Sequence, residues 1–195
     1  MEMFLENLIR FAKISGKLKT VKRSGWISHA KIVEPESVAD HSFRCGILAM
    51  CIGDLMGMPV EKLMKMMLLH DIHEAITGDY NTSAKQQGGI SELEHQQKIA
   101  IQEILSLFSS KLEKQYISLW EEFEQRETPE SILANDIDKI EMMFQALEYE
   151  KEGYDPEKFE TFWIDMRDRL KTPLIRDLFM ILQNERMTSE IGRNL

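Results

Sequence analysis

The stretch Val60–Thr77 constrains the fold most, because it is apolar on nearly every side of a helix and yet carries charged side chains. It contains neither Gly nor Pro, so it predicts one continuous helix at the centre of the molecule. Burying an unpaired charge costs on the order of several kcal/mol. His70, Asp71 and Glu74 share one side of such a helix, and we therefore expect a metal ion or another ligand to lie there.

Helical periodicity recurs along the whole chain, whereas alternating strand patterns are almost absent. Residues 1–195 therefore predict a single all-α domain, a bundle of about eight helices. Two long irregular stretches, residues 18–37 and 78–90, interrupt the pattern, and the mixture of residue types in the first is typical of a functional loop. Ser37 and Asp40 form a capping-box pattern where the second helix is expected to begin.

The charge balance limits the class of ligand. The chain has 24 Lys and Arg against 33 Asp and Glu, a net charge of -9, which argues against a nucleic-acid polymer as partner. Residues 1–31 have the opposite charge balance, with seven basic side chains and two acidic ones, so an anionic small ligand is plausible there. Cys45 and Cys51 point in different directions on one predicted helix, which favours reduced thiols in a cytoplasmic protein. No signal peptide or membrane-spanning run is recognisable.

Polar residues on two other predicted helices also face inward. His41 falls in the first turn of the second helix, on the side of Cys45, and is therefore expected in the interior. In the helix that begins near Pro129, Asp136 lies within the apolar stripe. Asp138 shares a side with polar residues and is expected to be solvated, so periodicity selects Asp136 as the buried carboxylate.

Four inward-facing side chains from three helices are thus expected to meet, namely His41, His70, Asp71 and Asp136. Two imidazoles and two carboxylates suit one divalent cation such as Mn²⁺, Co²⁺, Fe²⁺ or Mg²⁺, with room for water and a substrate oxygen. Such an ion would lower the pKa of the water and neutralise a phosphate oxygen. Glu74 and Asp79 lie at the rim by their spacing, where they are candidates for proton transfer.

The order His41, His70-Asp71, Asp136 resembles the H…HD…D signature of the HD superfamily of metal-dependent phosphohydrolases. Longer segments resemble the HD-domain 5′-deoxynucleotidases, the YfbR-like and HD domain-containing protein 2-like group. These segments are PESVADHSFR (35–44), LLHDIHEAITGD (68–79) and NDIDKIEMMFQALEYE (135–150). The resemblance extends over residues 5–185.

This resemblance implies a single HD domain over 1–195, with a core at about 36–150 and C-terminal helices at 155–190. It implies hydrolysis of deoxyribonucleoside 5′-monophosphates and a homodimer, for which the amphipathic C-terminal helices could supply the surface. By position, it implies metal ligation by His41, His70, Asp71 and Asp136, acid–base or water-positioning roles for Glu74 and Asp79, and substrate contacts for Arg23 and Trp26.

The substrate contacts have simpler alternatives. In one branch of the family the Arg and Trp are adjacent, whereas Ser24-Gly25 separates Arg23 from Trp26 here, as in the RTGW form of another branch. Arg23 could hold two phosphate oxygens or be solvated, and Trp26 could exclude a 2′-hydroxyl or anchor the loop on the core. Thr82 and Lys85 could line a phosphate pocket, although loops rich in such residues are common.

Two other functions fit the same residues. One is an HD hydrolase of another nucleotide: a cyclic nucleotide, a triphosphate or an alarmone. The other is a non-catalytic nucleotide-sensing module in which the metal only stabilises the fold. His73 is expected to project away from the side of His70 and Glu74, which favours one metal ion over two.

Overall fold

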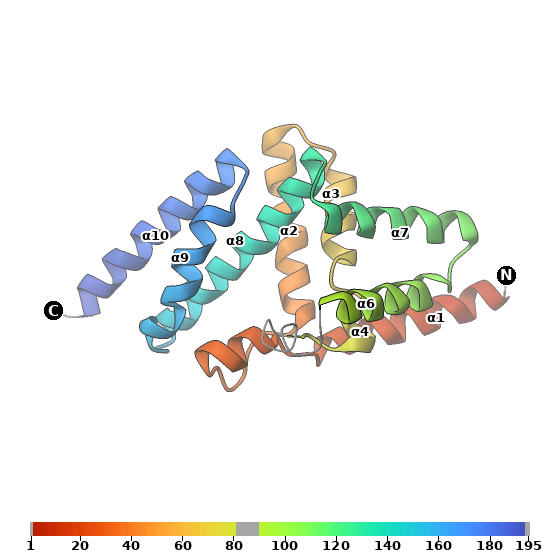
Figure 1. Cartoon of the computed structure of the whole chain (residues 1–195), viewed down its shortest axis with the longest axis horizontal. Helices are drawn as coiled ribbons and strands as arrows, with labels where there is room; N and C mark the ends of the chain where they lie inside the picture. Colours follow the sequence, from red (N-terminus) through yellow and green to blue (C-terminus); the bar gives the residue numbers. More distant parts are fainter. Residues whose placement is uncertain (1, 81–89, 194–195) are drawn as a thin grey trace.

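The computed structural model describes residues 2–80 and 90–193, and all repeating secondary structure in these ranges is helical (Figure 1). The predicted all-α fold is confirmed, with nine α-helices in the described ranges, one of them only four residues long. No helix in the described part of the chain is long and apolar enough to cross a membrane. The helices are α1 (Glu2–Gly16), α2 (Val38–Met56), α3 (Val60–Leu69), α4 (Glu74–Thr77), α6 (Ile90–Leu105), α7 (Ser110–Gln125), α8 (Pro129–Lys151), α9 (Glu160–Arg169) and α10 (Pro173–Arg193).

Helix α3 is central, as its apolar composition predicts. It packs against α2, α7 and α8, so its buried Leu63, Met66 and Met67 contribute to one core with the inner faces of those helices. Helix α8 is the longest of the described helices, and its two sides have different neighbours: α2, α3 and α7 on one, α9 and α10 on the other (Figure 1). Both sides of α8 are therefore interior.

The first turn of α2 is fixed by its cap. Ser37 Oγ accepts from the Asp40 amide at 3.2 Å, and the Asp40 carboxylate accepts from the Ser37 amide at 2.9 Å, which confirms the predicted capping box. Because His41 directly follows Asp40, this cap sets the direction in which the imidazole leaves the helix.

The prediction of one continuous helix over residues 60–77 is wrong, because α3 ends at Leu69 and α4 begins at Glu74. Between the two helices, each hydrogen bond spans three residues instead of four. The amide of Ile72 donates to the carbonyl of Leu69 at 3.2 Å, and the amide of Glu74 donates to the carbonyl of Asp71 at 3.0 Å. The indole of Trp120 donates to the His70 carbonyl at 3.2 Å, so a carbonyl released at the helix end keeps a partner. His70 and Asp71 therefore occupy a tight turn.

The loop before α2 runs back along the start of that helix. The amide of Arg23 donates to the Glu36 carbonyl at 3.1 Å, and the Val38 amide donates to the Val21 carbonyl at 2.9 Å. A π-helical turn, Trp26–Ala30, follows and ends at Lys31. These bonds bring the basic N-terminal segment to the same end of α2 as His41.

Candidate active site

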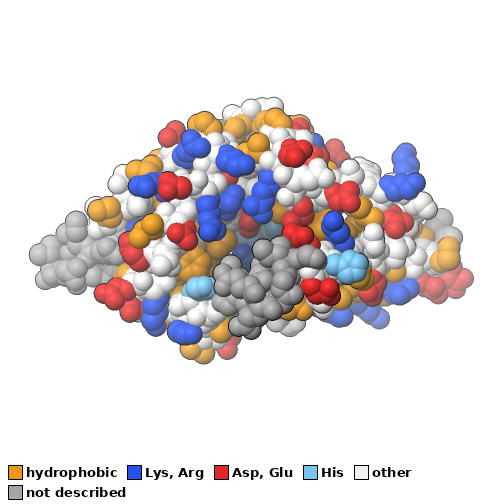
Figure 2. All heavy atoms as spheres, in the orientation of Figure 1, with side chains coloured by type: hydrophobic (Ala, Val, Ile, Leu, Met, Phe, Trp, Pro, Cys, Tyr) orange, Lys and Arg blue, Asp and Glu red, His pale blue; other side chains and the backbone are white. Residues whose placement is uncertain are grey.

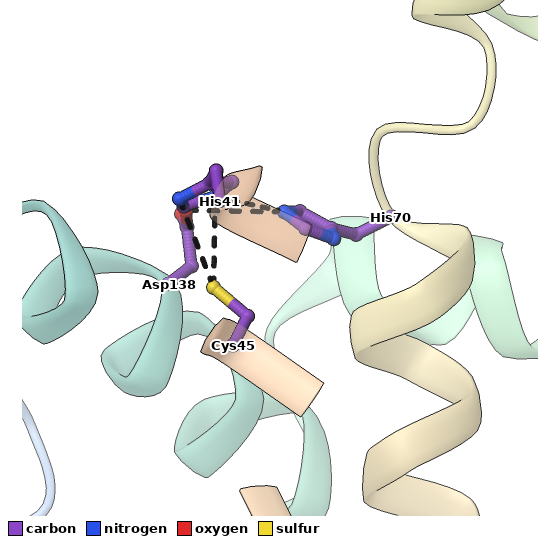
Figure 3. Close-up of side chains that lie close together, drawn as sticks. All are labelled: His41, Cys45, His70 and Asp138. Atoms are coloured by element: carbon purple, nitrogen blue, oxygen red, sulfur yellow. Dashed lines mark hydrogen bonds and ion pairs between the residues drawn. The ribbon is translucent and has the colours of Figure 1, made fainter. Parts of the chain in front are cut away.

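Four side chains converge at the end of α3: His41 from α2, His70 and Asp71 from the tight turn, and Asp138 from α8. His41 Nε2 lies 3.3 Å from His70 Nε2 and 3.1 Å from Asp138 Oδ1, and His70 Nε2 lies 3.1 Å from Asp71 Oδ2. The His41–Asp71 and His70–Asp138 pairs are each 3.9 Å apart. Figure 3 shows His41, His70 and Asp138 pointing toward one another.

These spacings fit ligands around one cation. Bonds of about 2.1 Å place neighbouring ligand atoms roughly 3.0–3.4 Å apart. His41, His70 and Asp138 also belong to a cluster whose ligand atoms all lie within 4.8 Å of one another. The donor set, two imidazoles and two carboxylates, therefore fits one divalent cation.

The partners of the two outer imidazole nitrogens fix the tautomers. His70 Nδ1 lies 2.7 Å from the Met67 carbonyl, which can only accept, so this nitrogen carries the proton. His41 Nδ1 bonds the carboxylate of Glu141 in the same way. In the neutral rings both Nε2 lone pairs then face the same point, the arrangement that metal-binding His residues adopt.

The prediction that Asp136 joins this cluster is wrong. Asp136 Oδ2 accepts from the amides of Lys171 and Thr172 at 2.8 and 2.6 Å, so this carboxylate caps the start of α10. Asp138 takes its place beside His41, although it was expected to be solvated. The two residues are about 200° apart around α8, and each faces one of the two interior sides of that helix.

A signal for Asp138 was present in α2. Arg44, one turn after His41, donates to Glu141 at 2.8 Å and to Gln145 at 2.6 Å, so the polar side of α8 lies against a polar side of α2. Matching two polar faces would have assigned Asp138 to the interior.

Cys45 packs beneath the His41 imidazole, 3.6 Å from Nε2, and is fully buried. Burial raises the pKa of its thiol to about 12. Cys45 thus packs as part of the hydrophobic core beneath the site.

A cavity of about 440 Å³ opens beside the cluster, and Figure 2 shows Lys and Arg side chains gathered near a hollow on this face. Arg23 lines it, and its guanidinium lies 3.2 Å from Asp71 Oδ2. Glu74 and Asp79 also line it, as expected. Asp79 accepts from the Ser24 amide at 2.6 Å, so it holds the Arg23 loop in place as well as facing the cavity.

Glu74 is a buried carboxyl group whose Oε2 has no hydrogen-bond partner among the described residues. Burial raises its pKa to about 10, and the negative charges of Asp71 and Asp79 act in the same direction. A carboxyl with this pKa is protonated at neutral pH, so it can donate a proton.

Trp26 is mainly part of the core. Only 2% of it is exposed, its indole donates to Glu36 at 2.8 Å, and its ring lies edge-on to Tyr149 at 5.5 Å. It also forms part of the cavity wall. Thr82 and Lys85 lie outside the described residues.

His73 does not project away from the site as expected, since it is buried in the cavity wall and its ring lies 6.2 Å from that of Trp120. The turn between α3 and α4 changes its direction. Other lining residues had no signal in the sequence, because loops and distant helices contribute them. They include Tyr80, Gln97, Phe123, Arg126, Met142 and Phe162.

Comparison with known proteins agrees with this architecture. The model of the HD domain family matches residues 15–176. The 5′-deoxynucleotidase HDDC2 of Dictyostelium discoideum is 37% identical over 194 residues, covering 93% of this chain and 100% of that protein. The protein of the same name from Danio rerio is 34% identical, covering 93% and 89%.

Among solved structures, a conserved hypothetical protein from Pyrococcus furiosus matches with a TM-score of 0.74 at 29% identity. The match covers 90% of this chain and 99% of that one. The family model, the relatives and the solved structure all cover most of the chain. This protein therefore belongs to the HD domain family.

Proposed function

We propose that this protein is a metal-dependent 5′-deoxynucleotidase, which hydrolyses deoxyribonucleoside 5′-monophosphates to a deoxynucleoside and phosphate. The observation that carries the proposal is the convergence of two imidazole nitrogens and two carboxylates beside a partly buried Arg23, in a cavity of nucleotide size. Relatives named 5′-deoxynucleotidase that align over nearly the whole chain support the substrate class.

His41, His70, Asp71 and Asp138 would hold the divalent cation. When bound, such a cation lowers the pKa of a water molecule and offsets phosphate charge. Glu141 and the Met67 carbonyl keep the two imidazoles in the tautomer that leaves Nε2 free.

The remaining chemistry belongs to side chains of the cavity wall. Arg23 presents a planar group that can hold two phosphoryl oxygens, and Asp79 orients its loop through the Ser24 amide. Glu74 holds a proton that it can give to the departing 5′-oxygen. Positioning and charge compensation then supply most of the rate enhancement.

The test is phosphate release from the five common deoxynucleoside monophosphates and their ribonucleotide counterparts, with Mn²⁺, Co²⁺ or Mg²⁺ and with EDTA. We expect metal-dependent release that is faster for the deoxy series. Triphosphates, cyclic nucleotides and an alarmone form parallel reactions, and turnover of one of these alone would assign a different HD hydrolase activity. Metal-dependent melting without turnover of any substrate would indicate a non-catalytic module.

Trp26 holds the Arg23 loop on the core, so its truncation should chiefly affect stability. We expect Trp26→Ala to lower the free energy of unfolding by about 3–5 kcal/mol, and Trp26→Phe by clearly less, because Phe refills most of the volume. Urea denaturation measures both. A role in sugar selection predicts in addition that Trp26→Phe narrows the deoxy/ribo ratio of kcat/KM, and an unchanged ratio would leave Trp26 as an anchor only.

The homodimer is also a proposal, and the structure offers two surfaces for it. Phe43, Ile47 and Met50 form an exposed row on α2, with Phe43 69% exposed. On α10, the surface expected from the sequence, Ile181 is 64% exposed.

We propose that a second copy covers the α2 row, because its large apolar side chains follow one another along a single helix face. Phe43→Ser with Ile47→Ser should convert the dimer to a monomer, whereas Ile181→Ser should not. Light scattering after size exclusion measures the mass. The reverse pattern would assign the interface to α10, and a monomeric wild type would remove the proposal.

We place the protein in the cytoplasm. Cys45 and Cys51 are both free, and Cys51 is exposed. An exposed thiol of this kind persists most readily in a reducing compartment.

A further inference from the structure

A second cavity, of about 340 Å³, lies on the other interior side of α8, where the chain passes from α9 to α10. Four basic residues line this cationic pocket: Arg126, Lys139, Arg169 and Lys171. Only two acidic residues, Asp136 and Asp168, share its wall. The excess of positive charge stands out in a chain whose net charge is -9.

The nearby carboxylates pair with two of these four cations, since Arg169 Nη2 lies 3.8 Å from Asp165 and Lys139 lies close to Asp136. Asp136 already accepts two amides, and it lies 3.4 Å from Lys139. Asp168 pairs with Arg167, which is not part of the pocket wall. Within the described part of the chain, neither Arg126 nor Lys171 has an ion-pair partner. Burial lowers the pKa of Lys139, and the charge of Arg126 acts in the same direction. A bound anion would relieve both effects.

The conformation of Arg126 also points to a role for its side chain. It ends α7 with φ 57°, the left-handed region that a residue with a Cβ rarely occupies and that usually contains Gly at this position. Arg126 lines both the cationic pocket and the 440 Å³ cavity beside His41 and His70, called the catalytic cavity below.

Asn135 also belongs to the wall of this pocket. Its Nδ2 donates to the carbonyls of Phe123 and Ser131 at 2.7 and 3.0 Å, which fixes the orientation of the amide. Its Oδ1 is buried and has no partner among the described residues. Because this oxygen is closed to solvent, the basic side chains are the groups of this wall that an anion can reach.

We propose that the cationic pocket is a second binding site for a phosphate-bearing anion, next to the catalytic cavity and sharing Arg126 with it. Arg126, Lys139, Arg169 and Lys171 would contact the oxyanions. The anion can be free phosphate, which the proposed reaction releases, or the phosphate chain of a nucleotide.

Equilibrium dialysis with radiolabelled inorganic phosphate and with labelled dATP tests the site, in Mn²⁺ and in EDTA. We expect binding that persists in EDTA and is at least about tenfold weaker in Arg169→Gln/Lys171→Gln, because two charge-assisted contacts are lost. Lys111→Gln/Lys114→Gln, an equal charge change at exposed positions of α7, should bind as the wild type does. Arg23→Gln, which alters only the catalytic cavity, should also leave this binding unchanged.

Tighter binding of dATP would identify a nucleotide as the ligand, and tighter binding of phosphate would identify the free anion. Equal binding by wild type and Arg169→Gln/Lys171→Gln would overturn the proposal. Both substituted residues are exposed, so the variant should fold, and circular dichroism checks this. Because dialysis requires no turnover, its result is independent of the proposed hydrolase activity.

Discussion

Asp138→Ala is expected to abolish metal-dependent phosphate release while the helices persist. The substitution removes the carboxylate that lies 3.1 Å from His41 Nε2 and would leave the proposed cation one ligand short. Loss of an outer-shell partner of a metal site typically costs 10–100-fold, so loss of a ligand should lower kcat/KM by at least about 100-fold. The measurement is phosphate release at saturating Mn²⁺, with circular dichroism to follow the fold.

Asp136→Ala is the matched control, because it removes the same group from the same helix two residues earlier. Asp136 accepts the amides of Lys171 and Thr172, and hydrogen bonds to a charged group contribute about 1.5–3 kcal/mol each. This variant should therefore lose stability in urea and retain most of its kcat/KM at a temperature where it is folded.

Metal binding separates the two variants without an activity assay. A ligand that binds only the folded state raises the melting temperature, so Mn²⁺ should stabilise Asp136→Ala and fail to stabilise Asp138→Ala. If instead Asp136→Ala lost metal stabilisation and Asp138→Ala kept it, the assignment of the cluster would be wrong.

These two residues also show where reasoning from the sequence stops. His41 and the start of α2 were predictable because Ser37, Asp40 and His41 lie within five positions and the cap is local. The choice between Asp136 and Asp138 was not, because an apolar stripe marks a buried side and α8 has two of them. Periodicity selects the side that faces α10, whereas the cluster lies on the side that faces α2.

The break between α3 and α4 was hidden for a related reason. No Gly or Pro in the sequence marks the break. The His70 carbonyl that the break leaves without a helical partner is instead satisfied by the indole of Trp120, fifty residues away in the sequence. Likewise, Trp26 is held by Glu36 and Tyr149, the second of which is more than one hundred residues distant. Helix positions were therefore predictable from local patterns, whereas the orientation of the site residues depends on long-range contacts.

The second large effect is expected for Glu74→Gln. This change keeps the shape of the side chain and removes the proton that Glu74 can transfer. General acid–base catalysis contributes about 10²–10⁴-fold, so we expect kcat to fall within that range while the Mn²⁺-induced rise in melting temperature remains. Glu94→Gln, at an exposed carboxylate in the wall of the same cavity, is the matched control and should keep its activity.

Glu74→Gln should also change how the free energy of unfolding depends on pH. In the metal-free protein the pKa of Glu74 is about 10, against an ordinary value of 4.5, so between these values the folded state holds a proton that the unfolded state has released. The contribution of Glu74 to stability is then complete below pH 4.5 and is lost as the pH rises toward 10, with a slope on the order of 1 kcal/mol per pH unit. Glu74→Gln has no such proton to lose.

Urea denaturation in EDTA at pH 6, 7, 8 and 9 measures this difference. The free energy of unfolding of the wild type should fall relative to that of Glu74→Gln as the pH rises, whereas Glu94→Gln should follow the wild type. Parallel curves for wild type and Glu74→Gln would show that Glu74 is ionised in the folded protein, and it could not then be the acid. A loss of turnover together with diverging curves requires a carboxyl group that stays protonated because it is buried and feels the negative charges of Asp71 and Asp79, which is the property the proposed proton donor must have.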